Sequence, residues 1–533
     1  MTMRRLLFAS TLVSATVIGS LLVGPAAAKK KPPPTPPPPP PPPSTSSNYV
    51  RTYANVVDGV KCDVTPEVVQ TTSDGGSIVL ALSSASSVLS SPSCSGVNWV
   101  VKLDAAGAPQ WQELVGCFNL APGYYTLGVS LQQTSDGGYV IGGGTLGCGL
   151  EGTCFSQCGL VEKLDPNGRL MWSRVYKSGG GDRESTINQI RQTSDGGFVA
   201  AGSFRDADDA IGAWILKLDG AGNAQWQRKL GPGGPSGVGR NHVYFNSVQQ
   251  TGDGGYFAGG EFTSYLRGPL GDTGVLAVRF DANGNVAWQR GFLSFDANDV
   301  PTASVHALSS IQTSDGGYLV TGNWGNGSGP LGACCRGALL LKLDSNGQSQ
   351  WQKALSGGVY CFFNGFNTTC AAIGADVYSV HQTADGGYSL AGSANLKEPD
   401  GAPLEPWLAK VDASGNVLWQ HLYYLTHPTT GRPLSQYFAS STLARDGGFL
   451  ALGFTGVTNP FDLVGELFAV RTDSAGNVGA CNAIRPASPL NVLDPGLATI
   501  APALPVQATS AIQGDVPASR TQANSIGGSG GRC

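Results

Sequence analysis

An Asp-Gly-Gly turn recurs seven times along this chain at nearly regular intervals. The turns begin at Asp74, Asp136, Asp195, Asp253, Asp315, Asp385 and Asp446, and successive turns are 62, 59, 58, 62, 70 and 61 residues apart. A repeat of this length is a structural unit that cannot bury its apolar face alone and must stack on its neighbours. The period therefore constrains the architecture more strongly than any other feature of the sequence.

One repeat shows how its strands are ordered. Residues 247–251 read as a strand, and residues 256–260 return after the Asp-Gly-Gly turn as a second one. Residues 275–280 are almost continuously apolar, as expected for a strand covered on both faces, and a second turn leads to residues 286–290. Four antiparallel strands in about 60 residues make one blade of a β-propeller. We therefore predict an all-β fold over residues 49–484, a seven-bladed β-propeller of four-stranded antiparallel blades.

A second motif, Lys/Arg-x-Asp-x-x-Gly, follows every Asp-Gly-Gly turn, and in six copies a tryptophan stands seven residues after its aspartate. An indole on the outer strand can fill the wedge between adjacent blades and bury on the order of 150–250 Å². The six blade-docking residues predicted in this way are Trp111, Trp172, Trp226, Trp288, Trp351 and Trp419. The seventh copy has Ala480 at this position.

The cation of the second motif stands two residues before each aspartate. The seven cations are Lys102, Lys163, Lys217, Arg279, Lys342, Lys410 and Arg471. The third strand of a blade ends on the same face as both hairpins, so we expect these cations to pair with hairpin carboxylates. Such pairs contribute about 0–1 kcal/mol each when they are exposed.

The Leu-Asp-x-x-Gly-x-x-x-Trp pattern resembles the blade repeat of pyrroloquinoline-quinone-type propellers, in which a tryptophan docks each blade onto the next. The whole unit, from Gln-Thr-Ser-Asp-Gly-Gly-Tyr to this pattern, is similar to repeats of secreted bacterial and archaeal propeller proteins of unknown function. The resemblance covers about Cys62 to Cys481. It implies the fold and leaves the function open, because propellers host unrelated activities. A quinone enzyme would also need a Ca²⁺ site and a stacking tryptophan in its channel, whereas these tryptophans fall on outer strands.

The N-terminal residues have the pattern of a secretory signal peptide, predicted over residues 1–28. Residues 1–5 carry two positive charges, residues 6–23 are largely apolar, and Ala26-Ala27-Ala28 offers a cleavage site. The alternative is an uncleaved membrane anchor, since the apolar stretch is almost long enough to span a bilayer. The location that we expect is secreted, periplasmic or at the cell surface, with no transmembrane segment after cleavage.

Two further segments lack the pattern of a folded domain. Residues 29–48 form a Lys/Pro-rich linker, predicted to be disordered, in which residues 32–43 hold eleven prolines and one threonine. Such a tract adopts polyproline II and spans roughly 35–40 Å. Residues 485–533 are rich in Ala, Pro, Ser and Gly and have no apolar periodicity, so we predict a disordered tail.

The composition narrows the class of partner. The 76 glycines and the charged fraction of 13% suit many strands and tight turns. The net charge is −4, and the one basic tract is at residues 29–31. Nucleic acid is therefore not expected as a partner. We expect a monomer that binds a protein or a glycan.

The long insertions of the repeats fall on the face opposite to the hairpins, which is where binding residues usually lie on a rigid scaffold. Aromatic side chains in or next to these loops are the candidate ligand-binding residues: Tyr244, Phe245, Trp324, Tyr360, Phe362 and Phe363. The alternative is that they fold inward and seal the loops.

Ten cysteines are candidates for structural disulfides in an exported chain: Cys62, Cys481, Cys94, Cys117, Cys148, Cys158, Cys334, Cys335, Cys361 and Cys370. A metal site made by Cys148, Cys154 and Cys158 is the alternative, but their loop contains no histidine and no Cys-x-x-Cys pair, so no metal is predicted. We expect every blade to be built from contiguous sequence, with no strand from one terminus completing the opposite terminal blade, so the seam between the last and first blades lacks a covalent link and a docking tryptophan. A Cys62–Cys481 disulfide could close that seam.

No catalytic constellation is evident. The five histidines share no motif, and there is no nucleophile elbow or phosphate loop. Three classes of function stay open. The first is an exported noncatalytic propeller that binds through its long-loop face, with no cofactor. The second is a quinoprotein-like or other enzyme with a site at the channel mouth, and the third is a structural surface or matrix component.

Overall fold

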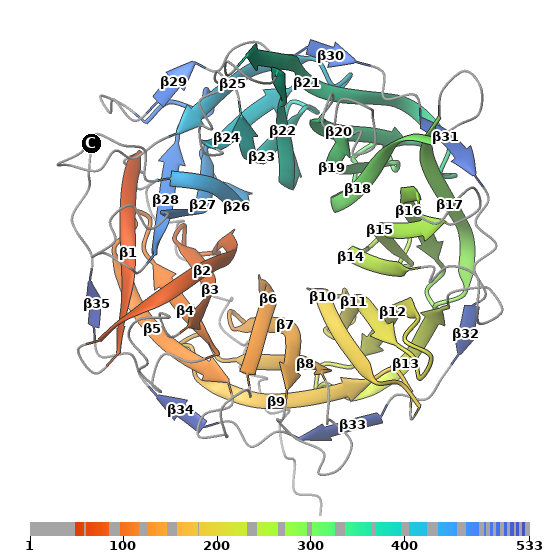
Figure 1. The fold of residues 1–533 in the computed structure, drawn as a ribbon. Coiled ribbons are helices and arrows are strands. Elements are labelled where there is room, and N and C mark those ends of the chain that lie inside the picture. The colour runs from red at the N-terminus through yellow and green to blue at the C-terminus, as the bar shows by residue number, and fades with distance from the viewer. Residues whose placement is uncertain are drawn as a thin grey trace, which may run out of the picture. The chain divides into compact units, whose positions relative to one another are not determined.

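The repeats form four-stranded antiparallel sheets in the computed structural model of the chain (Figure 1). The structure describes residues 48–57, 60–84, 96–116, 125–146, 157–179, 181–231, 242–264, 272–295, 301–325, 336–363, 368–395, 405–423, 435–455 and 465–478 and seven short segments between 484 and 527. The predicted signal peptide and nearly all of the linker lie outside these residues. Among the described residues, no helix is long and apolar enough to cross a membrane.

Each sheet is an up-and-down meander whose first strand lies nearest the centre of Figure 1. The first strands are β2 (Val60–Thr71), β6 (Tyr125–Gln133), β10 (Glu184–Gln192), β14 (Val243–Gln250), β18 (Pro301–Gln312), β22 (Thr368–Gln382) and β26 (Ser435–Leu443). The second strands are β3 (Ser77–Ser84), β7 (Tyr139–Leu146), β11 (Phe198–Arg205), β15 (Tyr256–Ser264), β19 (Tyr318–Gly325), β23 (Tyr388–Asn395) and β27 (Phe449–Thr455).

The third strands, which are almost entirely buried, are β4 (Val97–Leu103), β8 (Gln157–Leu164), β12 (Ile211–Leu218), β16 (Asp272–Phe280), β20 (Arg336–Leu343), β24 (Glu405–Val411) and β28 (Glu466–Thr472). The outer strands are β5 (Pro109–Gly116), β9 (Leu170–Lys177), β13 (Ala224–Leu230), β17 (Val286–Phe295), β21 (Ser349–Phe363), β25 (Val417–Tyr423) and β1 (Tyr49–Val57). This arrangement is an all-β fold of the β-propeller kind.

The tryptophans of the outer strands pack against the next sheet along the chain. Trp111 meets Tyr139 edge-on with ring centroids 5.7 Å apart. The same contact joins Trp172 to Phe198, Trp226 to Tyr256, Trp288 to Tyr318, Trp351 to Tyr388 and Trp419 to Phe449. Each indole also covers a turn glycine of that sheet. At Gly168, for example, φ is 81° and an added Cβ would lie 2.6 Å from the Trp111 ring, so no other residue fits.

The expectation that every sheet is built from contiguous sequence is wrong. The N-terminal strand β1 pairs with β28 and completes the last sheet, with Tyr49 opposite Arg471. In the first sheet, Trp111 stands opposite the motif cation Lys102 in the same way. Tyr49 therefore occupies the position in the last sheet that Trp111 occupies in the first. The ring of Tyr49 covers Gly107 as the indoles cover their glycines, and Tyr53 Oη donates to Gly107 O at 2.7 Å. Tyr49 is therefore the seventh docking aromatic. It serves the last sheet, for which the sequence motif has Ala480 in place of a tryptophan.

The C-terminal segment differs from the predicted disordered tail. Seven short strands follow one another, and each pairs with the outer strand of a different sheet, in reverse order of the sequence (Figure 1). They are β29 (Ile484–Pro486) on β25, β30 (Asn491–Leu493) on β21, β31 (Leu497–Ile500) on β17, β32 (Val506–Ala508) on β13, β33 (Ile512–Asp515) on β9, β34 (Ser519–Thr521) on β5 and β35 (Ser525–Gly527) on β1. Edge pairing uses backbone groups, so a segment without apolar periodicity can make it.

The expected pairing of the cations with hairpin carboxylates is confirmed for all seven. The pairs are Lys102–Asp74, Lys163–Asp136, Lys217–Asp195, Arg279–Asp253, Lys342–Asp315, Lys410–Asp385 and Arg471–Asp446. The cation side chains are only 3% to 17% exposed, so they are more deeply buried than surface ion pairs. Burial acts to raise the pKa of Asp136, but hydrogen bonds from Thr134 and Lys163 outweigh it and lower this pKa to about 2.

These pairs predict a loss of stability in acid. Unfolded aspartate titrates near pH ~3.9, and folded Asp136 near about 2. The stabilisation is therefore complete above pH ~4 and is lost as the pH falls toward ~2. We expect Asp136→Asn to cost about 1–2 kcal/mol at neutral pH, because it leaves Lys163 buried without its counter-ion while solvent screens the half-exposed site. Urea unfolding measures this, with Asp208→Asn on an exposed turn as the control; equal stability of the two variants would contradict the prediction.

Docking by Tyr49 predicts that Tyr49→Ala destabilises the protein by about 3 kcal/mol, as for other buried aromatics. Tyr49→Phe keeps the ring over Gly107 and should cost much less. Thermal unfolding of the two variants measures the difference. If Tyr49→Ala melts like the wild type, β1 does not hold the last sheet.

Pairing of the tail predicts that a chain ending at Ala483 has exposed outer strands. Hydrogen exchange should become faster at the backbone amides of β5, β9 and β13, which the tail strands otherwise bond, and should stay unchanged in β4, β8 and β12. Unchanged exchange in the outer strands would show that the tail does not pair with them.

Candidate functional site

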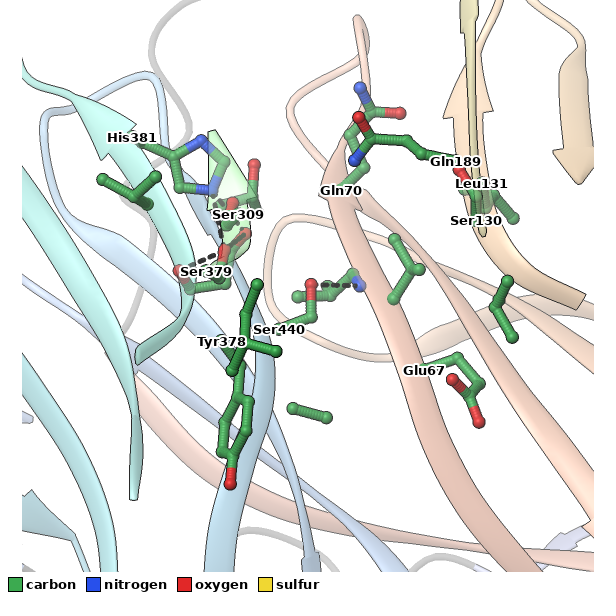
Figure 2. Close-up of a pocket in the computed structure, with 18 of the residues that line it drawn as sticks. Glu67, Gln70, Ser130, Leu131, Gln189, Ser309, Tyr378, Ser379, His381 and Ser440 are labelled. Carbon is green, nitrogen blue, oxygen red and sulfur yellow. Dashed lines mark hydrogen bonds between the residues drawn. The ribbon is translucent and has the colours of Figure 1, made fainter. Parts of the chain in front are cut away.

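A cavity of about 620 Å³ lies among the first strands of the sheets, and each of the first strands named above contributes to its lining (Figure 2). Most of its polar side chains are uncharged: serine, threonine, asparagine and glutamine. Valine, leucine and isoleucine alternate with them. Hydroxyl and amide groups beside aliphatic patches suit a ligand with many uncharged polar groups.

The lining is built by a β-bulge that recurs at the same place in the first strands. In each of them the pairing with the second strand shifts by one residue, as between Pro66 and Val68. The extra residues are Glu67, Val129, Asn188, Asn246, Leu308, Tyr378 and Ala439, and all of them line the cavity. A bulge re-aims a side chain without breaking the rest of the ladder. We call these residues the bulge ring.

The charged and titratable groups of the cavity lie at two levels. Glu67 belongs to the bulge ring, and burial raises its pKa to about 7. Arg191 lies three residues beyond the bulge of its own strand, and burial lowers its pKa to about 10. Its Nη1 donates to Ile190 O at 3.1 Å. His381 lies at the same level as Arg191; its Nε2 is 2.7 Å from Ser441 O, and burial lowers its pKa.

A second polar cluster lies beside the bulge residue Asn246. The carboxylate of Glu261, with only 3% of its side chain exposed, accepts a hydrogen bond from Tyr244 Oη at 2.7 Å. His306 Nδ1 lies 2.8 Å from the same oxygen, and Asn246 Nδ2 donates to the other oxygen at 3.3 Å. Burial and the negative charge of Glu261 raise the pKa of Tyr244. The cluster fixes the orientation of the His306 ring, which is partly exposed.

The structure does not gather the six aromatic candidates into one site. Tyr244 lies in the cluster just described, whereas Phe245 is fully buried and packs against Phe280. Neighbouring residues of a strand point to opposite faces, which separates these two. Trp324 is half-buried against the core around Phe257. Tyr360, Phe362 and Phe363 belong to β21, but their side chains lie outside the described residues.

The bulge ring was missed by the sequence prediction, although a signal for it exists. Its members stand seven residues before each Asp-Gly-Gly aspartate, a position that holds Glu, Val, Asn, Asn, Leu, Tyr and Ala. The residues of the turn are by contrast nearly the same in every repeat. Chemical diversity at a fixed position of a repeat indicates residues that are not needed to build the unit.

Most of the predicted disulfides cannot be traced in the described residues. Cys62 and Cys158 are fully buried, and Cys361 and Cys370 are directly opposite in the register of β21 and β22. Cys94, Cys117, Cys148, Cys334, Cys335 and Cys481 lie outside the described residues, so the pairings remain predictions.

No family model matches the chain, and no curated protein matches it. Among solved structures, a protein of unknown function from Dyadobacter fermentans is 14% identical, with 79% of this chain and 98% of that chain covered and a TM-score of 0.38. A protein of unknown function from Bacteroides caccae is 11% identical, with 58% and 93% covered and a TM-score of 0.28. The GH32 β-fructofuranosidase BmSUC1 from Bombyx mori is 9% identical, with 84% and 92% covered and a TM-score of 0.28. Likeness at these values bears on neither activity nor ligand.

Proposed function

We propose that the chain is a seven-bladed β-propeller that binds a glycan without catalysis. The glycan would bind in the cavity among the first strands and to the long loops on the face opposite to the hairpins. The bulge ring is the observation that carries this proposal: at one position of the repeat, seven strands present six types of side chain to the cavity. Hydroxyl, amide and aliphatic groups match the polar edges and apolar faces of sugar rings.

The seven-bladed arrangement is supported by hydrogen bonds between successive first strands. Ile190 N on β10 donates to Ser130 Oγ on β6, and Val248 N on β14 donates to Gln189 Oε1 on β10. Similar bonds join β2 to β6, β14 to β18, the turn after β18 to β22, and β22 to β26. Val69 N on β2 donates to Ser440 Oγ on β26, which links the first repeat to the last.

Binding is favoured over hydrolysis by the charges of the cavity. Glycosidases generally use two carboxyl groups on either side of the bond that they cleave. Among the described lining residues, Glu67 is the only carboxylate. The same lining contains no tryptophan, so it does not supply the stacking ring that the resemblance to quinone-dependent propellers would imply.

The setting that we propose follows the sequence. Residues 1–28 direct export, and the proline tract then holds the propeller away from a surface as a stiff spacer. A monomer in the periplasm, outside the cell or on its surface would present the loop face to soluble or surface glycans.

The proposal can be tested with a substitution that fills the cavity without removing a side-chain hydrogen bond. Val129 is a bulge residue, so Val129→Trp should block the cavity, whereas Leu418→Trp on an exposed outer strand should not. We expect a glycan array to show binding by the wild type and by Leu418→Trp, and at least a tenfold loss by Val129→Trp at unchanged melting temperature. A wild type that binds no glycan, or a Val129→Trp variant that binds as well as the wild type, would overturn the proposal.

A further inference from the structure

We propose that the part of the cavity between Glu67 and Tyr378 is a subsite for an ammonium group, so that the preferred ligand is a glycan with free amino groups. This inference rests on the proposed function, because it names the class of glycan that the same cavity takes. It is carried by the placement of Glu67 and Tyr378 in the bulge ring, on β2 and β22, and by the ring of Tyr437 on the intervening strand β26, which packs against the Tyr378 ring.

Glu67 is a carboxylate that reaches the cavity without a partner. No residue in the described part of the chain donates a hydrogen bond or forms an ion pair to its side chain. The guanidinium of Arg191 lies at another level: its strand position corresponds to Gln70, three residues or about 10 Å along the strand from Glu67. A carboxylate taken out of water is costly unless a cation compensates it. A cationic group of the ligand can supply that compensation.

Two aromatic rings lie on the strands β22 and β26, which precede β2 around the cavity. The rings of Tyr378 and Tyr437 have centroids 6.1 Å apart and planes at 65°. The pKa of Tyr437 is raised by its burial and also by Glu67 and Tyr378. Faces of tyrosine rings attract ammonium groups, and more strongly where water is excluded.

The strand between them leaves room for a ligand. Ala439 is the bulge residue of β26, and it has the smallest side chain of the bulge ring. Figure 2 shows Tyr378 and Glu67 on either side of Ser440, extending toward the end of the cavity opposite to His381. A primary ammonium held there would be attracted by the Glu67 carboxylate and by the Tyr378 ring, while the sugar hydroxyls face the serine and amide groups of the remaining strands.

The chemistry selects among glycans. A glucosamine-type sugar carries a protonated amine, which Glu67 can pair. An N-acetylated sugar has an uncharged amide in its place, and a glucose-type sugar has a hydroxyl. The cavity should therefore prefer the free amine, and the preference should disappear when the carboxylate is removed.

Isothermal titration of the full chain with hexamers of glucosamine, N-acetylglucosamine and glucose, just above neutral pH, tests this inference. We expect the glucosamine hexamer to bind about tenfold more tightly than the other two. Glu67→Gln should remove that preference, because it should weaken the binding of the glucosamine hexamer about tenfold more than that of the glucose hexamer. Asp208→Asn, which removes an equal charge outside the cavity, should keep the preference. Tyr378→Ala should weaken the binding of the glucosamine hexamer more than that of the glucose hexamer.

The outcomes separate this inference from the function on which it rests. Equal affinity for the three hexamers in the wild type, or an amine preference that survives in Glu67→Gln, would overturn the ammonium subsite and leave glycan binding intact. Binding of none of the hexamers would count against the proposed function itself. A trilysine peptide that binds more tightly than the glucosamine hexamer would point to a basic peptide and overturn the inference.

Discussion

The contact of one aromatic ring with one turn glycine holds each sheet against the next. In the repeat of Trp111, the ring covers Gly168, where the turn needs a positive φ and the ring leaves no space for a Cβ. The glycine is thus required twice, by its own turn and by its neighbour. Because this contact lies on the outer strand, it fixes the spacing of the sheets at the rim. The ion pair between the third strand and the first hairpin fixes the register within each sheet.

The sequence predicts well those parts of the structure that recur. Every repeat carries its turns, its cation and its aspartate, so the four-stranded sheets and the ion pairs could be expected. Tyr49 could not, because it lies before the first repeat and is a tyrosine where the motif has a tryptophan. The pairing of the C-terminal strands was also not predicted. Composition indicates how much apolar surface a segment can bury, but it does not indicate whether its backbone pairs with the edge of a sheet.

The site was the harder prediction for a similar reason. Choosing aromatic residues near loops selected both Tyr244 and Phe245, although strand alternation sends one to a polar cluster and the other into the core. The bulge residues escaped notice because no single residue type recurs throughout that position. Within a repeat protein, constancy marks what builds the unit, and variation at a structurally constant position marks what is available for recognition. Glu67 and Tyr378 are the members of that position with the most distinctive chemistry.

The pairing of β1 with β28 has a consequence for the order in which the chain can fold. Ribosomes make β1 before any other described strand, but its partner β28 belongs to the last repeat. The earlier sheets have all four strands as soon as they emerge, whereas β1 must wait for β26, β27 and β28, which are made near the end of synthesis. The tail then adds β35 to β1 as a final layer. Closure is therefore a late event that joins the first strand to the last repeat. In a nascent chain stalled before that repeat, the end of β1 could still pair with β2, but residues 49–53 would lack their partner strand.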